Sequence, residues 1–184
     1  QTYESWTHFL QFSGRFYKYT YDEQISIYFQ RPEATAVASY EIWNQQMRRY
    51  IKRGSVGIAV IDNSGNGTRL CYLFDIADTG TRQNSRTPNV WKMSREHEKA
   101  VAQDLEQQYG IPTDIGSLEN HLELLAMQKA SEYWEAHSEE IAGILDDSAL
   151  AVYDVDALGF NFRKAVSNST LYQLISRCLG NPDD

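Results

Sequence analysis

The pair His97-Glu98 matches the first half of the zinc-binding helix motif His-Glu-x-x-His. That motif requires a second histidine four residues after the first, so that both imidazoles share one helix face and one metal ion. Position 101 holds a valine, which breaks the motif. The remaining histidines stand apart without metal-ligand spacing: His8, His121 and His137. The sequence therefore predicts no metal site.

Other groupings with catalytic potential are better explained as turns or solvated helix ends. A nucleotide-binding loop needs a glycine-rich turn that leads into a helix, whereas Gly65-Asn66-Gly67 leads into an expected strand. Paired carboxylates can serve acid–base chemistry, but charged pairs are usually solvated. The pairs in this chain are Asp146-Asp147, Glu139-Glu140, and Asp154 with Asp156. We therefore predict that the isolated chain is not an enzyme and uses no cofactor.

A pattern of cations and aromatic residues, typical of nucleic-acid binding, occurs twice in the first 60 residues. Residues 15–21 interleave Arg and Lys with Phe and Tyr, and Trp43 precedes four cations within 48–53. Cations contact phosphates, and aromatic faces stack on unpaired bases at about 1–3 kcal/mol per base. The alternative is that the aromatic residues form the core, because Phe16, Tyr28 and Trp43 fall at helical spacing.

The net charge of −8 averages two unlike parts of the chain. Residues 1–60 carry seven Lys and Arg against five Asp and Glu, whereas residues 111–184 carry four against thirteen. The middle segment, residues 61–110, has six against seven. Such asymmetry says more about binding partners than the total charge does. The acidity therefore lies in the last third of the chain, and the dense basic run at 48–53 lies in the first.

Composition is typical of a folded protein without a membrane segment. The chain has 184 residues, of which 42% are apolar and 12% aromatic, enough for a core without disulfides or metals. Cys71 and Cys178 lie far apart, which fits a reducing compartment. Apolar runs stay well below the roughly 20 residues of a membrane span, and the start lacks a signal-peptide pattern. We expect a cytoplasmic bacterial protein with no membrane partner.

Apolar spacing predicts three helices before residue 55 and a β-hairpin after it. The helices are expected at about 6–16, from 21 or 22 to before Pro32 with Ile25, Tyr28 and Phe29 facing inward, and from about 39 to Gly54. Residues 56–60 and 70–76 alternate apolar and small or polar residues around a turn-rich segment, which is typical of a hairpin. Residues 79–90 are expected to form a polar loop.

The second half of the sequence predicts helices throughout. They are expected from Ser94 to about 109, from Ser117 onward, over 138–145 and over 162–178. Because no strand–helix–strand alternation occurs, the fold class is α+β: N-terminal helices, a small antiparallel hairpin or sheet, and a C-terminal helical region. We divide the chain into an α+β domain at 1–110 and an acidic helical extension at 111–184, packed on it.

Several short strings in the first 60 residues point to one protein family. They are Trp6, Phe16-Tyr17-Lys18-Tyr19, Gln24-Ile25-Ser26-Ile27, Gln30-Arg31-Pro32, Trp43, and Ile51-Lys52-Arg53-Gly54-Ser55-Val56-Gly57-Ile58. In this order they resemble the N-terminal domain of ArdC-type antirestriction proteins, and residues 69–109 look similar to the continuation of such proteins. Two departures are present: Ser55-Val56 stands where the family has Glu-Lys, and the His-Glu-x-x-His of fuller members is absent.

The resemblance implies an α+β module that binds single-stranded DNA with little sequence preference. In that family the module begins large mobile-element proteins of conjugation and antirestriction, which carry helicase or methyltransferase regions. We place Tyr19, Tyr21, Arg48, Lys52 and Arg53 on one groove. The full set of expected DNA-binding residues is Arg15, Lys18, Tyr19, Tyr21, Gln24, Trp43, Arg48, Arg49, Lys52, Arg53 and Gly54.

Two alternatives remain open at this point. The acidic helical region can act as a protein-interaction or DNA-mimic module for a basic partner, such as a restriction or conjugation protein. The chain can also be an accessory domain that contributes to chemistry only within a larger parent protein, or that docks other domains of that parent.

Overall fold

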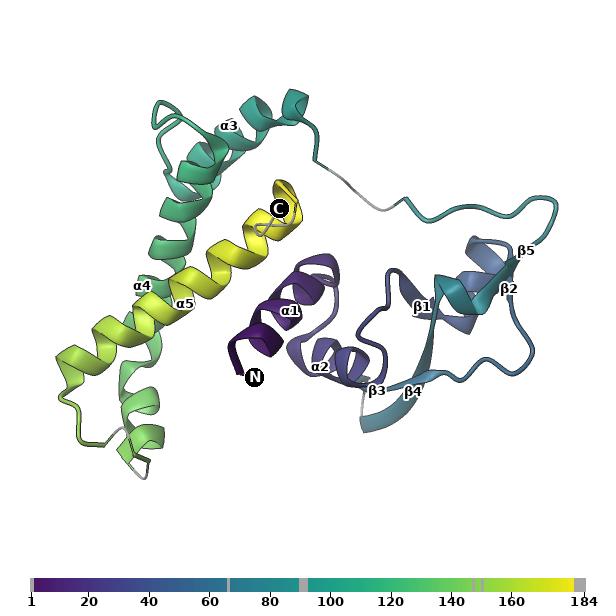
Figure 1. Cartoon of the computed structure of the whole chain (residues 1–184), viewed down its shortest axis with the longest axis horizontal. Helices are drawn as coiled ribbons and strands as arrows, with labels where there is room; N and C mark the ends of the chain where they lie inside the picture. The colour runs from purple at the N-terminus through teal and green to yellow at the C-terminus, as the bar shows by residue number, and fades with distance from the viewer. Residues whose placement is uncertain (1, 66, 90–92, 147, 150, 181–184) are drawn as a thin grey trace. The chain divides into compact units, whose positions relative to one another are not determined.

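The computed structural model describes residues 2–65, 67–89, 93–146, 148–149 and 151–180, and it confirms the α+β class (Figure 1). The chain forms two compact units, residues 1–91 and 92–184. The helix that follows Ser94 therefore packs in the second unit, whereas the expected boundary at 110 grouped it with the first. None of the described helices combines the length and the apolar content needed to cross a membrane.

Two helices supply most of the aromatic core of the first unit. Helix α1 (Thr2–Arg15) and helix α2 (Tyr21–Gln30) match the first two expected helices. Phe12 and Ile27 are fully buried, one from each helix. The expectation that Phe29 faces inward is wrong, since its side chain is 81% exposed. Ile27, two positions earlier, takes the inward place.

The third expected helix, from about 39 to Gly54, is wrong in most of its length. Residues Val37–Ser39 form strand β1, Ile42–Gln46 form a short π-helix, and Arg49–Ile51 form strand β2. The spacing of Trp43 and Met47 is helical, which explains the prediction. Arg48 has φ 54°, in the left-handed region, so a right-handed helix cannot continue through it.

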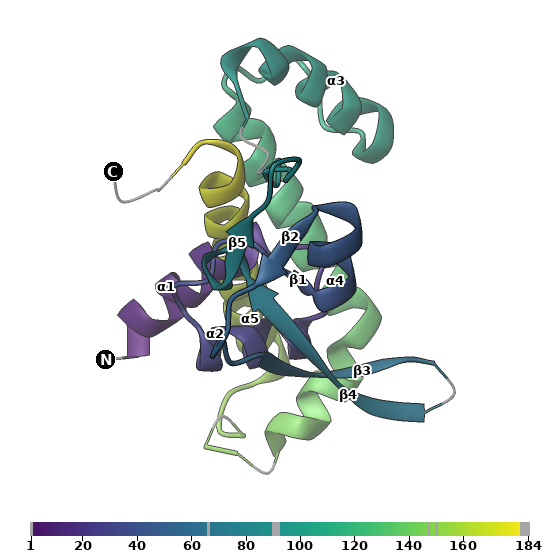
Figure 2. The ribbon, with the colours of Figure 1, turned by 90° about the vertical axis from the view of Figure 1, so that its right-hand side faces the viewer.

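The predicted hairpin is confirmed, and its strands are longer than expected. Strand β3 (Ile58–Gly65) pairs with β4 (Gly67–Asp75), with Ile58 opposite Leu73, and the two run side by side to their turn (Figure 2). The sheet order is β1-β4-β3. One sheet face buries Ile58, Val60 and Leu73 in the same cluster as Phe12 and Ile27. Burial of this face fixes the register, because a one-residue slip would expose it.

A second, two-stranded sheet was not anticipated. Strand β5 (Thr79–Thr81) lies in the segment expected to be a loop and pairs antiparallel with β2. Between β4 and β5 the chain makes one turn of 3-10 helix, Ile76–Asp78. The pairing of β2 with β5 joins residues about 30 positions apart, so no local sequence pattern indicates it.

The carboxylate of Asp75 holds the end of β4 in place. Its two oxygens accept hydrogen bonds from the backbone N–H groups of Thr35 (2.8 Å), Ala36 (3.0 Å) and Ala77 (2.9 Å). Asp75 is only 3% exposed, so these donors have no easy replacement from water. The same side chain thus caps the 3-10 turn and ties the segment before β1 to β4.

The described residues of the second unit form helices and the loops that join them, and no strand. A 3-10 turn (Arg95–His97) leads into α3 (Glu98–Tyr109), followed by α4 (Leu118–Asp146) and α5 (Val155–Cys178). Gly110 ends α3 with φ 72°, as its left-handed cap requires. Helix α4 runs through the residues expected to form a separate helix at 138–145. An apolar cluster joins these helices, with Leu105, Ile111, Leu118 and Leu122 buried.

Replacing Asp75 by Ala should lower the free energy of unfolding of the first unit by about 2–4 kcal/mol, because three backbone donors lose a charged acceptor. Urea denaturation followed by circular dichroism would measure the change. Glu33→Ala is the matched control, since the interaction of Glu33 within the described residues is an exposed ion pair with Arg31, and its loss should cost below about 1 kcal/mol. Equal effects of the two substitutions would contradict the role of Asp75.

Candidate nucleic-acid interface

The pairing of β2 with β5 gathers six cations from two separate segments. Besides the strand pairing, Lys52 N–H donates to the Asp78 carbonyl (2.9 Å), Arg86 N–H to the Met47 carbonyl (2.8 Å), and the Ser85 hydroxyl to the Arg48 carbonyl (2.6 Å). Residues 78–86 therefore lie along residues 47–52. We call the cations brought together in this way the basic ribbon: Arg48, Arg49, Lys52, Arg53, Arg82 and Arg86.

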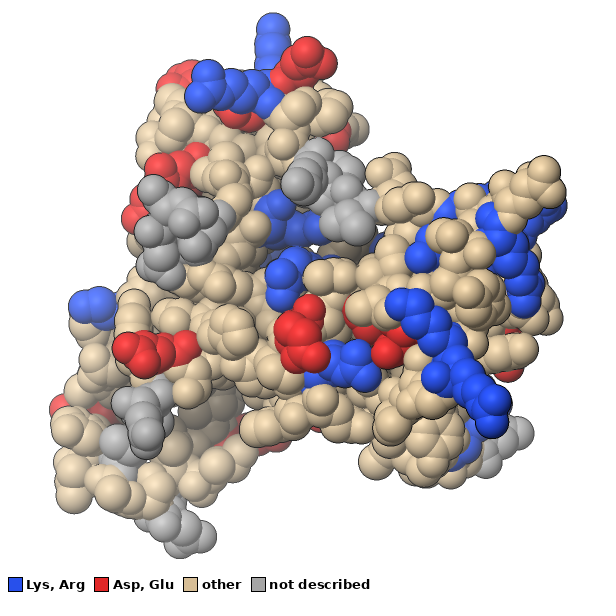
Figure 3. Space-filling model, turned by 45° about the vertical axis from the view of Figure 1, so that its right-hand side comes forward, with Lys and Arg blue, Asp and Glu red and all other residues tan. Residues whose placement is uncertain are grey.

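The basic ribbon is not neutralised by the unit's own acids. Among the described residues, no member of it forms an ion pair with a carboxylate. The unit's ion pairs lie elsewhere: Arg31 with Glu33 (3.6 Å) and Asp78 (3.4 Å), and Arg69 with Asp62 (2.6 Å). Figure 3 shows blue side chains at the outer edge of the first unit, on the side where β2 and β5 lie, with mainly tan surface between them.

Arg49 is the most buried member of the basic ribbon. It is 9% exposed, and its Nε–H donates to the Thr79 hydroxyl at 2.6 Å. A guanidinium has five N–H donors in a planar fork that matches the oxygens of a phosphate. Thr79 is its side-chain partner among the described residues, so most of these donors remain available to a ligand. The burial holds the group in one orientation.

Tyr50 presents an aromatic ring beside these cations. It is 43% exposed and lies across from Gly80, where a Cβ atom would overlap the phenol ring. The Arg82 guanidinium lies 5.8 Å from the ring centroid and donates a hydrogen bond to the Asn44 side chain at 2.9 Å. A glycine at position 80 thus allows the half-exposed ring to rest on the backbone of β5, and the Arg82 cation lies over the ring.

The turn after β2 exposes Arg53. Ser55 N–H donates to the Lys52 carbonyl at 3.2 Å, and Gly54 has φ 86°. A positive φ at the third residue of a four-residue turn is the requirement of a type II turn, which favours glycine there. The Lys52 ammonium donates to the Ala77 carbonyl at 2.9 Å, so this side chain also links the turn to the 3-10 segment. Arg53 is exposed.

Three of the expected DNA-binding residues are used by the fold. Trp43 is 2% exposed and its indole N–H donates to the Phe74 carbonyl at 2.7 Å, so its ring belongs to the core and is not free to stack. The Tyr19 hydroxyl donates to the Val37 carbonyl at 2.7 Å. The Gln24 amide donates to the carbonyls of Phe16 (3.2 Å) and Tyr19 (2.8 Å). Because its hydroxyl is engaged within the fold, Tyr19 is removed from the predicted DNA-binding groove.

Arg15, Lys18 and Tyr21 lie at the junction of α1 and α2 and are exposed. Lys18 Nζ lies 5.9 Å from the Tyr17 ring centroid, and the Tyr21 ring meets that of Phe9 edge-on at 6.0 Å. In the described part of the chain, no hydrogen bond, ion pair or ring contact joins these three side chains to the basic ribbon. They form a separate exposed group.

Sequence reasoning missed Tyr50, Arg82 and Arg86 as members of the site. The pattern Arg49-Tyr50-Ile51 alternates as a strand does, and Thr79-Gly80-Thr81 carries two β-branched residues. Both signals span only three residues. Their meaning depends on the pairing of β2 with β5, which is non-local.

No family model matches this chain, and neither the curated proteins nor the solved structures contain a significant match to it. The resemblance drawn from residues 6–61 therefore stays a prediction.

Replacing Tyr19 by Phe should reduce stability by about 1 kcal/mol near neutral pH, because the partly buried hydrogen bond to Val37 is lost. Burial, assisted by the Glu23 carboxylate, raises the pKa of the Tyr19 phenol to about 12. The unfolded phenol ionises near pH 10. The native protein should therefore lose this stabilisation as the pH rises from about 10 to 12, whereas the Phe variant should not.

Urea denaturation of both proteins across that range would measure the difference, which should shrink above pH 10. A difference that stays constant would show that the phenol is not buried. DNA affinity should be the same in both proteins, because the hydroxyl is already engaged within the fold.

Proposed function

We propose that the first unit binds single-stranded DNA with little sequence preference, through the basic ribbon and the ring of Tyr50. The observation that supports this most directly is the gathering, around two paired strands, of six cations that form no ion pair within the described residues, together with the exposed ring of Tyr50. Cations that contact phosphates release condensed counterions, and this release supplies most of the affinity of non-specific binding. The function includes no chemical step.

The two parts of the site have separate tasks. The guanidinium groups of Arg49, Arg53 and Arg86 contact successive phosphates, which positions the strand without reading its sequence. The ring of Tyr50 stacks on one unpaired base, a contact that any base can make because every base has an aromatic face. A single strand offers such a base, whereas a duplex keeps its bases paired, so single strands are preferred.

The parent context follows from the proposed resemblance to ArdC-type N-terminal domains. In that context the unit holds displaced single-stranded DNA of a mobile element while other regions of a larger cytoplasmic protein act on it. The junction residues Arg15, Lys18 and Tyr21 extend the contact along the strand. The unit itself supplies binding and no catalysis.

A second function is favoured by the charge of the second unit. Residues 92–184 carry 17 Asp and Glu against 7 Lys and Arg, and six exposed glutamates lie on α4: Glu119, Glu123, Glu132, Glu135, Glu139 and Glu140. Such a surface can bind a basic protein or imitate DNA toward a DNA-binding partner. If this is the function, neutralising Glu139 and Glu140 should abolish partner binding while DNA affinity remains unchanged.

Replacing Arg53 and Arg86 together by Gln should reduce the magnitude of the slope of log affinity against log salt by about 1.4, since each phosphate contact of a single strand contributes roughly 0.7. Fluorescence anisotropy with a labelled oligonucleotide at several salt concentrations would measure it. Arg69→Gln is the matched control, because Asp62 already pairs with this exposed arginine at 2.6 Å. An equal effect of the control would place binding outside the basic ribbon.

Replacing Gly80 by Ala should displace the Tyr50 ring and weaken binding about as much as Tyr50→Ala does, by about 1–3 kcal/mol for one lost stacking contact. Tyr50→Phe should retain the affinity, because the stacking face is kept. Gly67→Ala, where a Cβ meets no atom within 4 Å, is the control. The same anisotropy titration serves here, and unaltered binding by both Gly80→Ala and Tyr50→Ala would remove Tyr50 from the site.

A further inference from the structure

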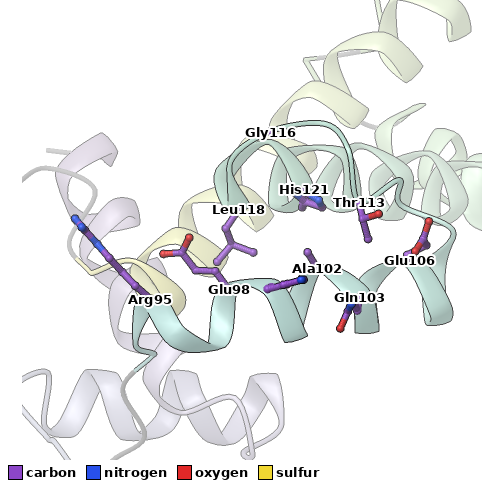
Figure 4. Close-up of a pocket in the computed structure, with 10 residues that line it drawn as sticks. Arg95, Glu98, Ala102, Gln103, Glu106, Thr113, Gly116, Leu118 and His121 are labelled. Atoms are coloured by element: carbon purple, nitrogen blue, oxygen red, sulfur yellow. The ribbon is translucent and has the colours of Figure 1, made fainter.

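A polar cavity lies within the second unit, between α3 and the beginning of α4 (Figure 4). Its volume is about 510 Å³, within the range of pockets that bind small molecules. Successive turns of α3 contribute Glu98, Ala102 and Glu106 to one wall, and His121 of α4 lies on the other. The cavity is separate from the basic ribbon, and its lining comes entirely from the second unit.

His121 has an unpaired ring nitrogen at this cavity. Its Nδ1 lies 2.7 Å from the Ser117 carbonyl oxygen. Because a carbonyl only accepts hydrogen bonds, Nδ1 carries a proton and donates, and in the neutral form of the ring Nε2 presents a lone pair. The side chain is 2% exposed, and Nε2 has no partner among the described residues. A buried acceptor without a donor is costly, which points to a ligand that supplies one.

Two carboxylates flank this histidine. In Figure 4 the ring of His121 points from α4 toward α3, with Glu98 to one side and Glu106 to the other. Neither carboxylate forms an ion pair within the described part of the chain. Arg95 and Lys99 also line the cavity, but Figure 4 shows Arg95 at its end, extending away from His121. Glu98 thus lies toward the Arg95 end of the cavity and Glu106 toward the other end, with His121 between them.

An anionic ligand does not fit these groups. A carboxylate or a phosphate would bring its own lone pairs against the lone pair of Nε2 and its charge against Glu98 and Glu106. A cation with N–H groups can donate to Nε2, and Glu98 and Glu106 balance its charge. The excess of acids in residues 92–184 further favours cations over anions near this surface.

We propose that this cavity binds a small organic cation that carries N–H donors, a primary ammonium or a guanidinium group. One N–H donates to Nε2 of His121, and the carboxylates of Glu98 and Glu106 balance the charge. Nε2 is covered in the free protein, so this binding requires side chains of the cavity lining to shift when the ligand binds.

Agmatine, which carries both groups, and tetramethylammonium, which has the charge but no N–H donor, are suitable probes. Isothermal titration calorimetry on the whole chain should detect agmatine and not tetramethylammonium. In protein labelled with ¹⁵N-histidine, agmatine should shift the Nε2 resonance of His121, assigned by its loss in His121→Gln. Glu98→Gln and Glu106→Gln should each weaken agmatine binding about tenfold or more, the size of a lost charge-assisted hydrogen bond.

Asp104→Asn is the matched control on α3, since Asp104 is exposed and outside the cavity lining. It should leave agmatine binding unchanged. Equal binding of tetramethylammonium, or agmatine binding without a shift at His121, would overturn the hydrogen bond to Nε2. Binding of inorganic phosphate in place of agmatine, or no binding of any probe, would overturn the proposal as a whole. Each of these outcomes is independent of DNA binding by the first unit.

Discussion

The hydrogen bonds received by the Asp75 carboxylate determine where the chain goes after the three-stranded sheet. Asp75 ends β4, accepts from Thr35 and Ala36 before β1, and caps the 3-10 turn through Ala77. That turn directs Thr79–Thr81 against β2. Without it, residues 79–86 would not lie along residues 47–52, and the cations of the basic ribbon would belong to two unconnected segments. A single buried carboxylate in this way links the core to the surface proposed to bind DNA.

Local patterns were sufficient for elements whose stabilising contacts lie within the element or between chain neighbours. The second helix before Pro32, the alternation around the β3–β4 turn and the end of the helix at about residue 109 all depend on residues close in sequence. These predictions were confirmed. The fold class followed from them, because the absence of strand–helix alternation is a property of element order.

The predictions that were wrong concern segments whose structure depends on residues distant in the sequence. The segment from Ser39 to Gly54 has helical spacing, yet Trp43 is buried by its bond to the Phe74 carbonyl, and Arg49 by its bond to Thr79. Both partners lie some 30 residues ahead in the sequence. For the same reason, residue type and spacing do not distinguish Trp43 and Tyr19, which the fold uses, from exposed aromatic residues. Tyr50 is recognised as a surface ring only once its strand is paired with the strand that holds Gly80. Composition identified the basic character of the segment but not which of its residues face solvent.

Arg49 shows how the fold and the proposed function meet in one residue. Burying a guanidinium without a carboxylate partner costs free energy, and an apolar residue at this strand position would serve the fold at least as well. A carboxylate opposite it would remove the cost but would also occupy the donors that a phosphate needs. Thr79 satisfies one donor and leaves the charge uncompensated, so the missing partner is best supplied from outside the unit. The free protein bears the electrostatic cost of this charge, and a bound polyanion would relieve it. This cost therefore favours the first unit over the acidic second unit as the nucleic-acid-binding part of the chain.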